Sequence, residues 1–140
     1  MKKILIVNAN YYKNISKKLV SNSKKILNKN FKVNLVNVPG IYEIPIAIRK
    51  NIKKFDGFVA LGCVIKGQTP HFDLICYSTF NSILNLSINF NKPIGNGIIT
   101  AYNMKQALQR CKNSVSNKPN KGSEAANAVI SILQNGIKKI

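Results

Sequence analysis

Short apolar runs alternate along the chain with longer segments in which apolar residues recur at helical spacing. Runs of this length, closed by polar, glycine or proline residues, are typical of buried strands. Four such runs are present, at residues 3–8, 31–38, 57–61 and 94–100. Strands that alternate with amphipathic helices predict a parallel sheet with helices on both faces. We therefore expect an α/β fold with a four-stranded parallel sheet, in a single domain spanning residues 1–140.

Amphipathic segments between and after these runs are expected to be helices. The first places Ile15, Leu19 and Ile26 on one face and lysines elsewhere, as in a helix that covers a sheet. Two more carry apolar residues at helical spacing, at Ile44, Ala47, Ile48 and Ile52 and at Met104, Ala107, Leu108 and Cys111. Segment 72–90 is apolar around much of its circumference, so we expect it to contact a second surface besides the sheet. The last helix is expected to begin near Lys121 and to bury Ala125, Ala128, Val129 and Ile132.

Residues 55–73 contain the candidate reactive centre. We expect a buried strand closed by Gly62, a polar loop that includes Gly67, and then a helix, with Pro70 in the loop or in the first turn of that helix. In open α/β sheets, ligands bind where strand carboxyl ends meet helix amino ends, and the free N–H groups there favour an anion such as phosphate. His71, the only histidine, lies at this junction. Histidine exchanges protons readily near neutral pH, so both a catalytic and a purely structural role are open.

The charge of the chain is strongly positive. It carries 22 basic residues against four acidic ones, a formal net charge of +18, which is typical of proteins that bind nucleic acid or anionic membranes. The lysines are nevertheless spread along the chain without aromatic residues interleaved at a readout spacing, and the abundance of lysine, asparagine and isoleucine points to A+T-rich codons. We expect no nucleic acid and no membrane as a partner. A basic nucleic-acid-binding protein is the alternative, and steep salt dependence of binding would distinguish it.

The cysteines and the amino terminus indicate a cellular compartment. Cys63, Cys76 and Cys111 have no metal-ligand or redox-motif spacing, and reduced thiols are typical of cytoplasmic proteins. The apolar run after Lys2 and Lys3 is too short for the core of a signal peptide. No run approaches the roughly 20 apolar residues of a membrane span. We expect a cytoplasmic protein without a metal site.

Several motifs resemble those of the lumazine synthases, which catalyse the penultimate step of riboflavin biosynthesis. They are VPGIYEIP at 38–45, LGCVIKGQTPHFD at 61–73, GIITAYNMKQALQR at 97–110 and NKGSEAA at 120–126. The resemblance implies a flavodoxin-like three-layer α/β/α sandwich. It also implies a transferase, needing no cofactor, that condenses 5-amino-6-(D-ribitylamino)uracil with 3,4-dihydroxy-2-butanone 4-phosphate. The products would be 6,7-dimethyl-8-ribityllumazine, phosphate and water.

The same resemblance implies roles for residues of the phosphate site. His71 matches the histidine that serves as acid and base. Gly67, Gln68 and Thr69 match the loop that binds phosphate through backbone N–H groups, with Arg110 as the counter-charge. A planar guanidinium suits bidentate phosphate binding, and Arg110 is one of only two arginines in a lysine-rich chain. A solvated cation at the end of a helix is the alternative for Arg110.

A second group of residues matches the family's contacts with the uracil and ribityl groups. These residues are Tyr11, Ile41, Tyr42, Glu43, Asn96 and Lys121. The resemblance implies that Tyr11 stacks on the pyrimidine, that Glu43 accepts hydrogen bonds from ribityl hydroxyls, and that Glu124 supports Lys121. For Glu43, expected in the first turn of a helix, a favourable interaction with the helix dipole is the competing explanation. For Lys121 and Glu124, capping and helix-dipole roles at the start of a helix compete.

Three positions depart from the family pattern. Gln68 stands in place of a small residue, Tyr12 in place of an asparagine, and Asn96 in place of an aromatic residue that flanks the pyrimidine. These changes bear on substrate affinity more than on the type of reaction. Two alternatives with the same fold stay open: a flavin-binding module without turnover, which has no use for His71, and a shell protein that has lost catalysis.

The resemblance also implies partners. Besides the small-molecule substrates, it implies a homopentamer with active sites between subunits, and functional coupling to riboflavin synthase. Arg110 and Lys121 would reach into the site of the next subunit. Some members of the family assemble pentamers into a hollow shell. Here the link from Cys111 to Asn120 is longer than in the shell-forming pattern and the chain starts at its first core strand, so we expect a free pentamer or at most a pair of rings.

Overall fold

A computed structural model of the protein describes residues 1–113, 119–134 and 138–140. Its elements follow in the order β1 (Lys3–Ala9), α1 (Lys13–Leu27), β2 (Lys32–Val38), the short 3₁₀ helix η1 (Ile41–Glu43), α2 (Ile44–Lys50), β3 (Gly57–Ile65), α3 (His71–Phe90), β4 (Ile94–Ala101), α4 (Met104–Arg110) and α5 (Lys121–Gln134). The strands form one four-stranded sheet in the order β2-β1-β3-β4. All its strand pairs are parallel, which confirms the predicted sheet.

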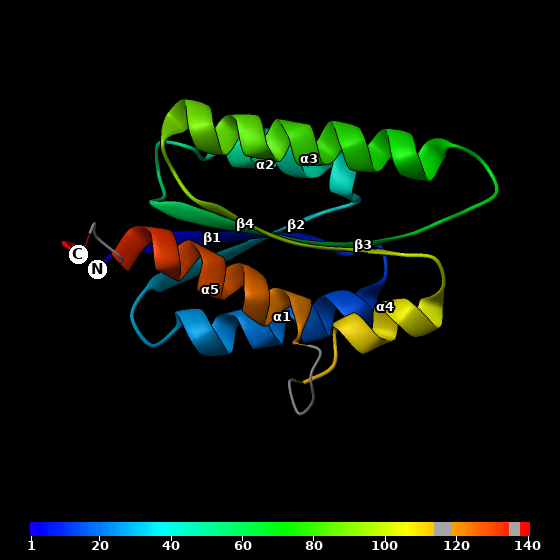
Figure 1. Ribbon diagram of the computed structural model, residues 1–140, viewed down its shortest axis with the longest axis horizontal. Coiled ribbons are helices and arrows are strands. Elements are labelled where there is room, and N and C mark those ends of the chain that lie inside the picture. The colour runs from blue at the N-terminus through cyan, green and yellow to red at the C-terminus, as the bar shows by residue number, and fades with distance from the viewer. Residues whose placement is uncertain (114–118, 135–137) are drawn as a thin grey trace.

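The helices form a layer on each face of the sheet. Helices α2 and α3 cover one face, and α1, α4 and α5 cover the other (Figure 1). Alternate residues of each strand enter the two cores, as the strand period of two requires. In β1, for example, Ile4 and Ile6 lie in the core beneath α1 and α5, whereas Leu5 and Val7 lie in the core beneath α2 and α3. This is the flavodoxin-like three-layer sandwich that was predicted.

The carboxyl ends of the strands gather at one edge of the sandwich. The connections from β1 to α1, from β3 to α3 and from β4 to α4 all lie at this edge, and the two chain termini lie at the opposite one (Figure 1). The loops that carry most of the candidate site residues therefore share one edge, where ligands bind in folds of this kind.

Strand β3 is longer than predicted. It continues through Gly62 and ends only at Ile65. A Cβ atom at Gly62 would lie 2.9 Å from Cγ2 of Ile41 and 3.0 Å from Cβ of Ala9, closer than real side chains approach. The glycine therefore allows η1 and the end of β1 to pack tightly against β3, and it does not mark the end of the strand.

Helix α5 presents a different face to the core from the one predicted. Ala125 and Val129 are buried as expected, but Ala128 and Ile132 are exposed, and Ala126 is buried instead. The reason is the close approach of α5 to both α1 and β4. A side chain at Gly122 would overlap the carbonyl oxygen of Leu19 in α1, and one at Gly95 would overlap that of Ala125. These contacts fix the rotation of α5.

Helix α3 is the least buried of the long helices. Of its 20 residues only Thr79 and Ile83 are buried, and it ends where Asn91 adopts the left-handed conformation (φ 54°). Its exposed large apolar residues are Leu74, Tyr77, Leu84, Ile88 and Phe90. The predicted surplus of apolar surface on this helix is therefore present. No helix in the described part of the chain is long and apolar enough to cross a membrane.

Candidate functional site

His71 is the first residue of α3, and its side chain is exposed at the carboxyl edge of the sheet. Pro70 precedes it without any side-chain cap on the first turn, so the N–H groups of that turn are left for a ligand or water. The loop before it is open: residues 66–70 are exposed, and a Cβ atom at Gly67 would have no neighbour within 4 Å. An anion can approach this backbone next to a side chain able to transfer protons.

A hollow of about 200 Å³ lies at the free edge of β4. We call it the β4-edge hollow, and its walls include Phe80, Asn96, Thr100, Arg110 and Lys121. Arg110 ends α4 and Lys121 begins α5, so two cations from different helices face the same space. The structure thus brings together three of the predicted site residues that are far apart in sequence, Asn96, Arg110 and Lys121.

Asn120 fixes the start of α5 beside the end of α4. Its Oδ1 accepts hydrogen bonds from the N–H groups of Gly122 (2.7 Å) and Ser123 (3.1 Å), and its Nδ2 donates to the carbonyl of Cys111 (2.7 Å). Because the side chain is fully buried, these bonds are shielded from water. No site role was predicted for Asn120, although an asparagine just before an apolar helical segment is a recognisable N-cap signal.

Glu124 forms an ion pair with Lys121 in the first turn of α5. Its Oε1 is 3.9 Å from Nζ of Lys121, and the two side chains are 48% and 31% exposed. An ion pair with this exposure contributes little to stability, at most about 1 kcal/mol. Its geometry fits the predicted supporting role, in which Glu124 orients the lysine.

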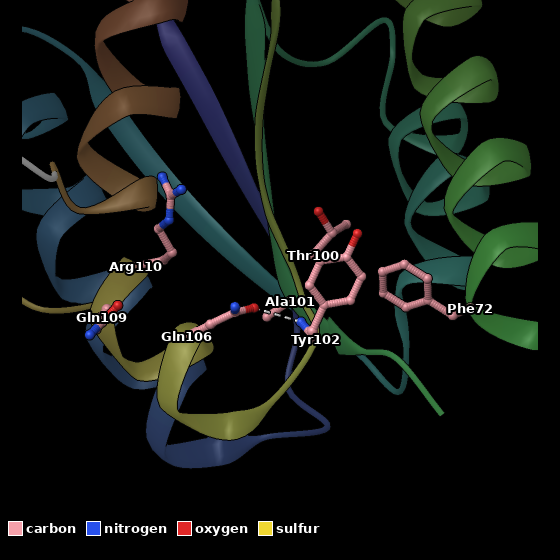
Figure 2. A pocket seen from close by; sticks show the side chains of 7 residues that line it. All are labelled: Phe72, Thr100, Ala101, Tyr102, Gln106, Gln109 and Arg110. Atoms are coloured by element: carbon pink, nitrogen blue, oxygen red, sulfur yellow. Dashed lines mark hydrogen bonds between the residues drawn. The ribbon is translucent and has the colours of Figure 1, made fainter. Parts of the chain in front are cut away.

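A second hollow, of about 420 Å³, adjoins the first and shares Thr100 and Arg110 with it. Figure 2 shows Arg110 extending from α4 toward α5 and away from Phe72 and Tyr102, whose rings lie on the other side of this hollow. The turn before α4 is held by a hydrogen bond of 2.8 Å from the N–H of Tyr102 to Oε1 of Gln106 (Figure 2). The guanidinium is thus directed toward the β4-edge hollow.

Tyr42 and Glu43 line a third hollow, between η1 and α3, of about 380 Å³. Tyr42 is 64% exposed. Glu43 precedes α2, outside its first turn, and its Oε1 accepts a hydrogen bond of 3.0 Å from the N–H of Gly40. The prediction that Glu43 lies in the first turn of this helix is therefore wrong, since Glu43 immediately precedes it. One carboxylate oxygen instead holds the backbone at Gly40, and the other makes no hydrogen bond to the residues that the structure describes.

Tyr11 and Ile41 differ sharply in exposure. Tyr11 meets Tyr12 edge to face, with ring centroids 4.9 Å apart, and because it is 73% exposed most of its ring is accessible for stacking. Ile41 is buried in the core beneath α2 and α3. Only the backbone of Ile41 can contact a ligand at this edge.

The predicted site residues therefore fall into two groups. The first group follows the carboxyl ends of β1, β2 and β3 and consists of Tyr11, Tyr42, Glu43, the loop at Gly67, Gln68 and Thr69, and His71. The second group belongs to β4, α4 and α5 and consists of Asn96, Arg110, Lys121 and Glu124. None of the three hollows contains residues from both groups. In the described part of one chain, the predicted site residues therefore lie in two separate groups.

The cysteine thiols do not provide a nucleophile. Burial is the main cause that raises the pKa of Cys63 to about 12, and the nearby Cys111 adds to it. This thiol therefore stays protonated at neutral pH. Burial also raises the pKa of Cys76 and of Cys111. Within the described ranges, no three His, Cys, Asp or Glu side chains are grouped as metal ligands would be.

Comparison with known proteins gives a consistent result along the chain. Residues 1–135 match the family model of 6,7-dimethyl-8-ribityllumazine synthase. Curated proteins of that name from Bartonella bacilliformis and from Campylobacter jejuni subsp. jejuni are each 38% identical to the chain, over 134 and 137 residues. These alignments cover 92% and 94% of this chain and 88% and 87% of the relatives. The protein of the same name from Bartonella henselae is 40% identical over 134 residues, with 92% and 86% covered. The chain therefore belongs to the 6,7-dimethyl-8-ribityllumazine synthase family.

Proposed function

We propose that the protein catalyses the condensation of 5-amino-6-(D-ribitylamino)uracil with 3,4-dihydroxy-2-butanone 4-phosphate. The products are 6,7-dimethyl-8-ribityllumazine, phosphate and water, and residues 1–140 act as one catalytic domain in the cytoplasm. The observation that carries the proposal is the family match over residues 1–135, in a chain that keeps His71 and Arg110. A flavin-binding module without turnover would have no use for an exposed histidine at the phosphate loop.

His71 is proposed to transfer the protons of the reaction. An amine attacks the ketone and forms an imine with loss of water, phosphate then leaves, and a second amine closes the ring with loss of water. Each step moves a proton. His71 is exposed at the start of α3, where it can act as acid and base in turn, and such catalysis typically accelerates a reaction about 10²–10⁴-fold. Holding the two substrates together supplies most of the remaining acceleration.

The phosphate group is proposed to bind between the open loop at Gly67, Gln68 and Thr69 and the guanidinium of Arg110. The loop and the uncapped first turn of α3 offer backbone N–H groups, and the arginine offers a planar pair of donors. The side chain of Gln68 is exposed, so it can point away from a ligand that binds only to the backbone. No cofactor takes part in this scheme.

The uracil and ribityl groups are proposed to bind along the same edge. The exposed ring of Tyr11 stacks on the pyrimidine, and Tyr42 and the backbone of Ile41 contact the ring and the chain. The free oxygen of Glu43 accepts hydrogen bonds from the ribityl hydroxyls. Lys121, held beside Glu124, acts from the second group of residues.

A second copy of the chain is proposed to bring the two groups of site residues together. Helix α3 exposes Leu74, Tyr77, Leu84 and Ile88, an apolar surface of the kind that subunits bury. A homopentamer in which Arg110 and Lys121 complete the neighbour's site accounts for both observations. The product would then be available to riboflavin synthase.

The assembly is expected to be a free pentamer or at most a pair of rings. The link that argues against a shell runs from Cys111 to Asn120, and its residues 114–118 lie outside the described part of the chain. The net charge of +18 per chain adds repulsion between rings at low salt. Light scattering on the purified protein measures the particle mass, and a particle the size of a closed shell would refute the expectation.

The proposed reaction can be tested with the purified protein and its two substrates. Lumazine has its own absorbance and fluorescence, so its appearance is followed directly, with phosphate release measured in parallel. Omission of either substrate or of the protein gives the controls. Lumazine and phosphate should form together at a rate proportional to protein concentration, and formation no faster than without protein would reject the function.

A further inference from the structure

Asn96 faces the α3 side of the sheet. Side chains alternate along β4, and Ile98, two residues further on, lies in the core beneath α2 and α3. The Oδ1 atom of Asn96 accepts a hydrogen bond of 3.0 Å from the N–H of Ile98. This bond fixes the amide so that its Nδ2, which donates to no other described residue, is left for a ligand in the β4-edge hollow.

Phe80 lies across the same hollow, on α3. Phe80 is half-buried: it packs against the core beneath α2 and α3 and also lines the β4-edge hollow. It is the aromatic residue among those that line this hollow. Arg110 and Lys121 are the cations that line it. The hollow thus combines one aromatic wall, one amide donor and two cations.

We propose that Phe80 is a substrate-binding residue, whose ring forms the apolar wall against which the pyrimidine of the first substrate lies. Asn96 then donates a hydrogen bond from Nδ2 to a carbonyl oxygen of that pyrimidine. A planar ring with carbonyl groups at its edge fits an aromatic wall that stands beside an amide donor. This inference rests on the proposed function and assigns the two residues to the pyrimidine, not to the phosphate substrate.

The first test replaces Phe80 by leucine, which keeps an apolar side chain on the core but removes the aromatic face. Stacking of a base on an aromatic side chain is worth enough that the KM for the pyrimidine should rise roughly ten-fold. The KM for the butanone phosphate should change less than two-fold. Phe90→Leu is the matched control, because Phe90 ends the same helix, where it lies under the guanidinium of Arg49 (4.7 Å). An unchanged pyrimidine KM in Phe80→Leu would overturn the proposal, as would an equal rise for both substrates.

The second test moves the ring across the hollow. Residues 80 and 96 line the same space of about 200 Å³, so a phenylalanine at position 96 can occupy volume vacated at position 80. We expect Phe80→Ala to raise the pyrimidine KM. Asn96→Phe also removes the Nδ2 donor, so the double variant Phe80→Ala/Asn96→Phe is compared with Phe80→Ala/Asn96→Leu, which lacks both the donor and the ring, and it should bind the pyrimidine more tightly. A double variant with phenylalanine at position 96 that binds the pyrimidine no more tightly than the leucine variant would overturn the proposal.

Binding of the product 6,7-dimethyl-8-ribityllumazine, measured by its fluorescence, provides a readout besides turnover. Thermal unfolding and particle mass identify any variant that fails to assemble. If Phe80→Ala fails to assemble, the KM values of Phe80→Leu alone test the proposal. The two proposals fail in different ways. A wild-type protein that forms no lumazine rejects the function itself, whereas an active wild type with a Phe80→Leu variant of unchanged pyrimidine KM rejects only the role of Phe80.

Discussion

Replacement of His71 by alanine is expected to lower kcat by about 10²–10⁴-fold, the usual contribution of a general acid–base residue. The fold should be unaffected, because the side chain is exposed at the first residue of α3 and forms no hydrogen bond with the described residues. The measurement is steady-state lumazine formation, accompanied by thermal unfolding and particle mass for the variant.

His71→Asn is the matched control for this prediction. Asparagine keeps hydrogen-bonding groups near the same place but does not titrate, so it should be nearly as inactive as alanine if proton transfer is the role of His71. A kcat within two-fold of the wild type in His71→Ala would remove the histidine from the mechanism. Restoration of most of the activity by asparagine would assign it to binding instead.

Replacement of Arg110 by alanine is expected to raise the KM for the butanone phosphate about ten- to a hundred-fold. This range corresponds to the loss of a charge-assisted hydrogen bond, worth about 1.5–3 kcal/mol. Arg110 lines the β4-edge hollow, where Lys121 provides the other cation. The KM for the pyrimidine should move little, because the guanidinium is assigned to the phosphate group and the pyrimidine is assigned to Tyr11, Phe80 and Asn96.

Two further variants control for charge and for structure. Arg110→Lys keeps the positive charge but loses the planar pair of donors, so it should recover only part of the affinity. Arg49→Ala removes the other arginine, which packs over Phe90, and should leave both KM values unchanged. Equal increases in both KM values for Arg110→Ala would mean that Arg110 is a structural residue.

The fold could be predicted largely from periodicity, and its errors come from close packing. The sequence predicts that β3 ends at Gly62, because glycine often closes a strand. In the structure, the absence of a side chain at Gly62 instead allows Ile41 to pack against the strand. Ala128 and Ile132 have helical spacing with Ala125 and Val129, yet the rotation of α5 is set by Gly122 against Leu19. Such contacts join residues that are far apart in sequence, and a local pattern does not contain them.

The site was predictable in its residue types and less so in its geometry. The motifs identified His71 and Arg110, and the resemblance implied that Arg110 serves the neighbouring subunit, but the hollow that Arg110 shares with Asn96, Phe80 and Lys121 comes from the structure. Asn120 had a recognisable capping signal, whereas its bond to Cys111 depends on how α4 and α5 meet. Nothing in the sequence places Phe80 opposite Asn96, because one belongs to a helix and the other to an edge strand.

The most direct test of this account combines two inactive variants. His71→Ala and Arg110→Ala chains, co-expressed in equal amounts, assemble into mixed oligomers. If each site takes His71 from one subunit and Arg110 from its neighbour, about a quarter of the sites contain both residues. Lumazine formation at low butanone phosphate should then recover to about a quarter of the wild-type rate, far above either variant alone. Mixed oligomers of the correct mass that form lumazine no faster than the separate variants would contradict the account.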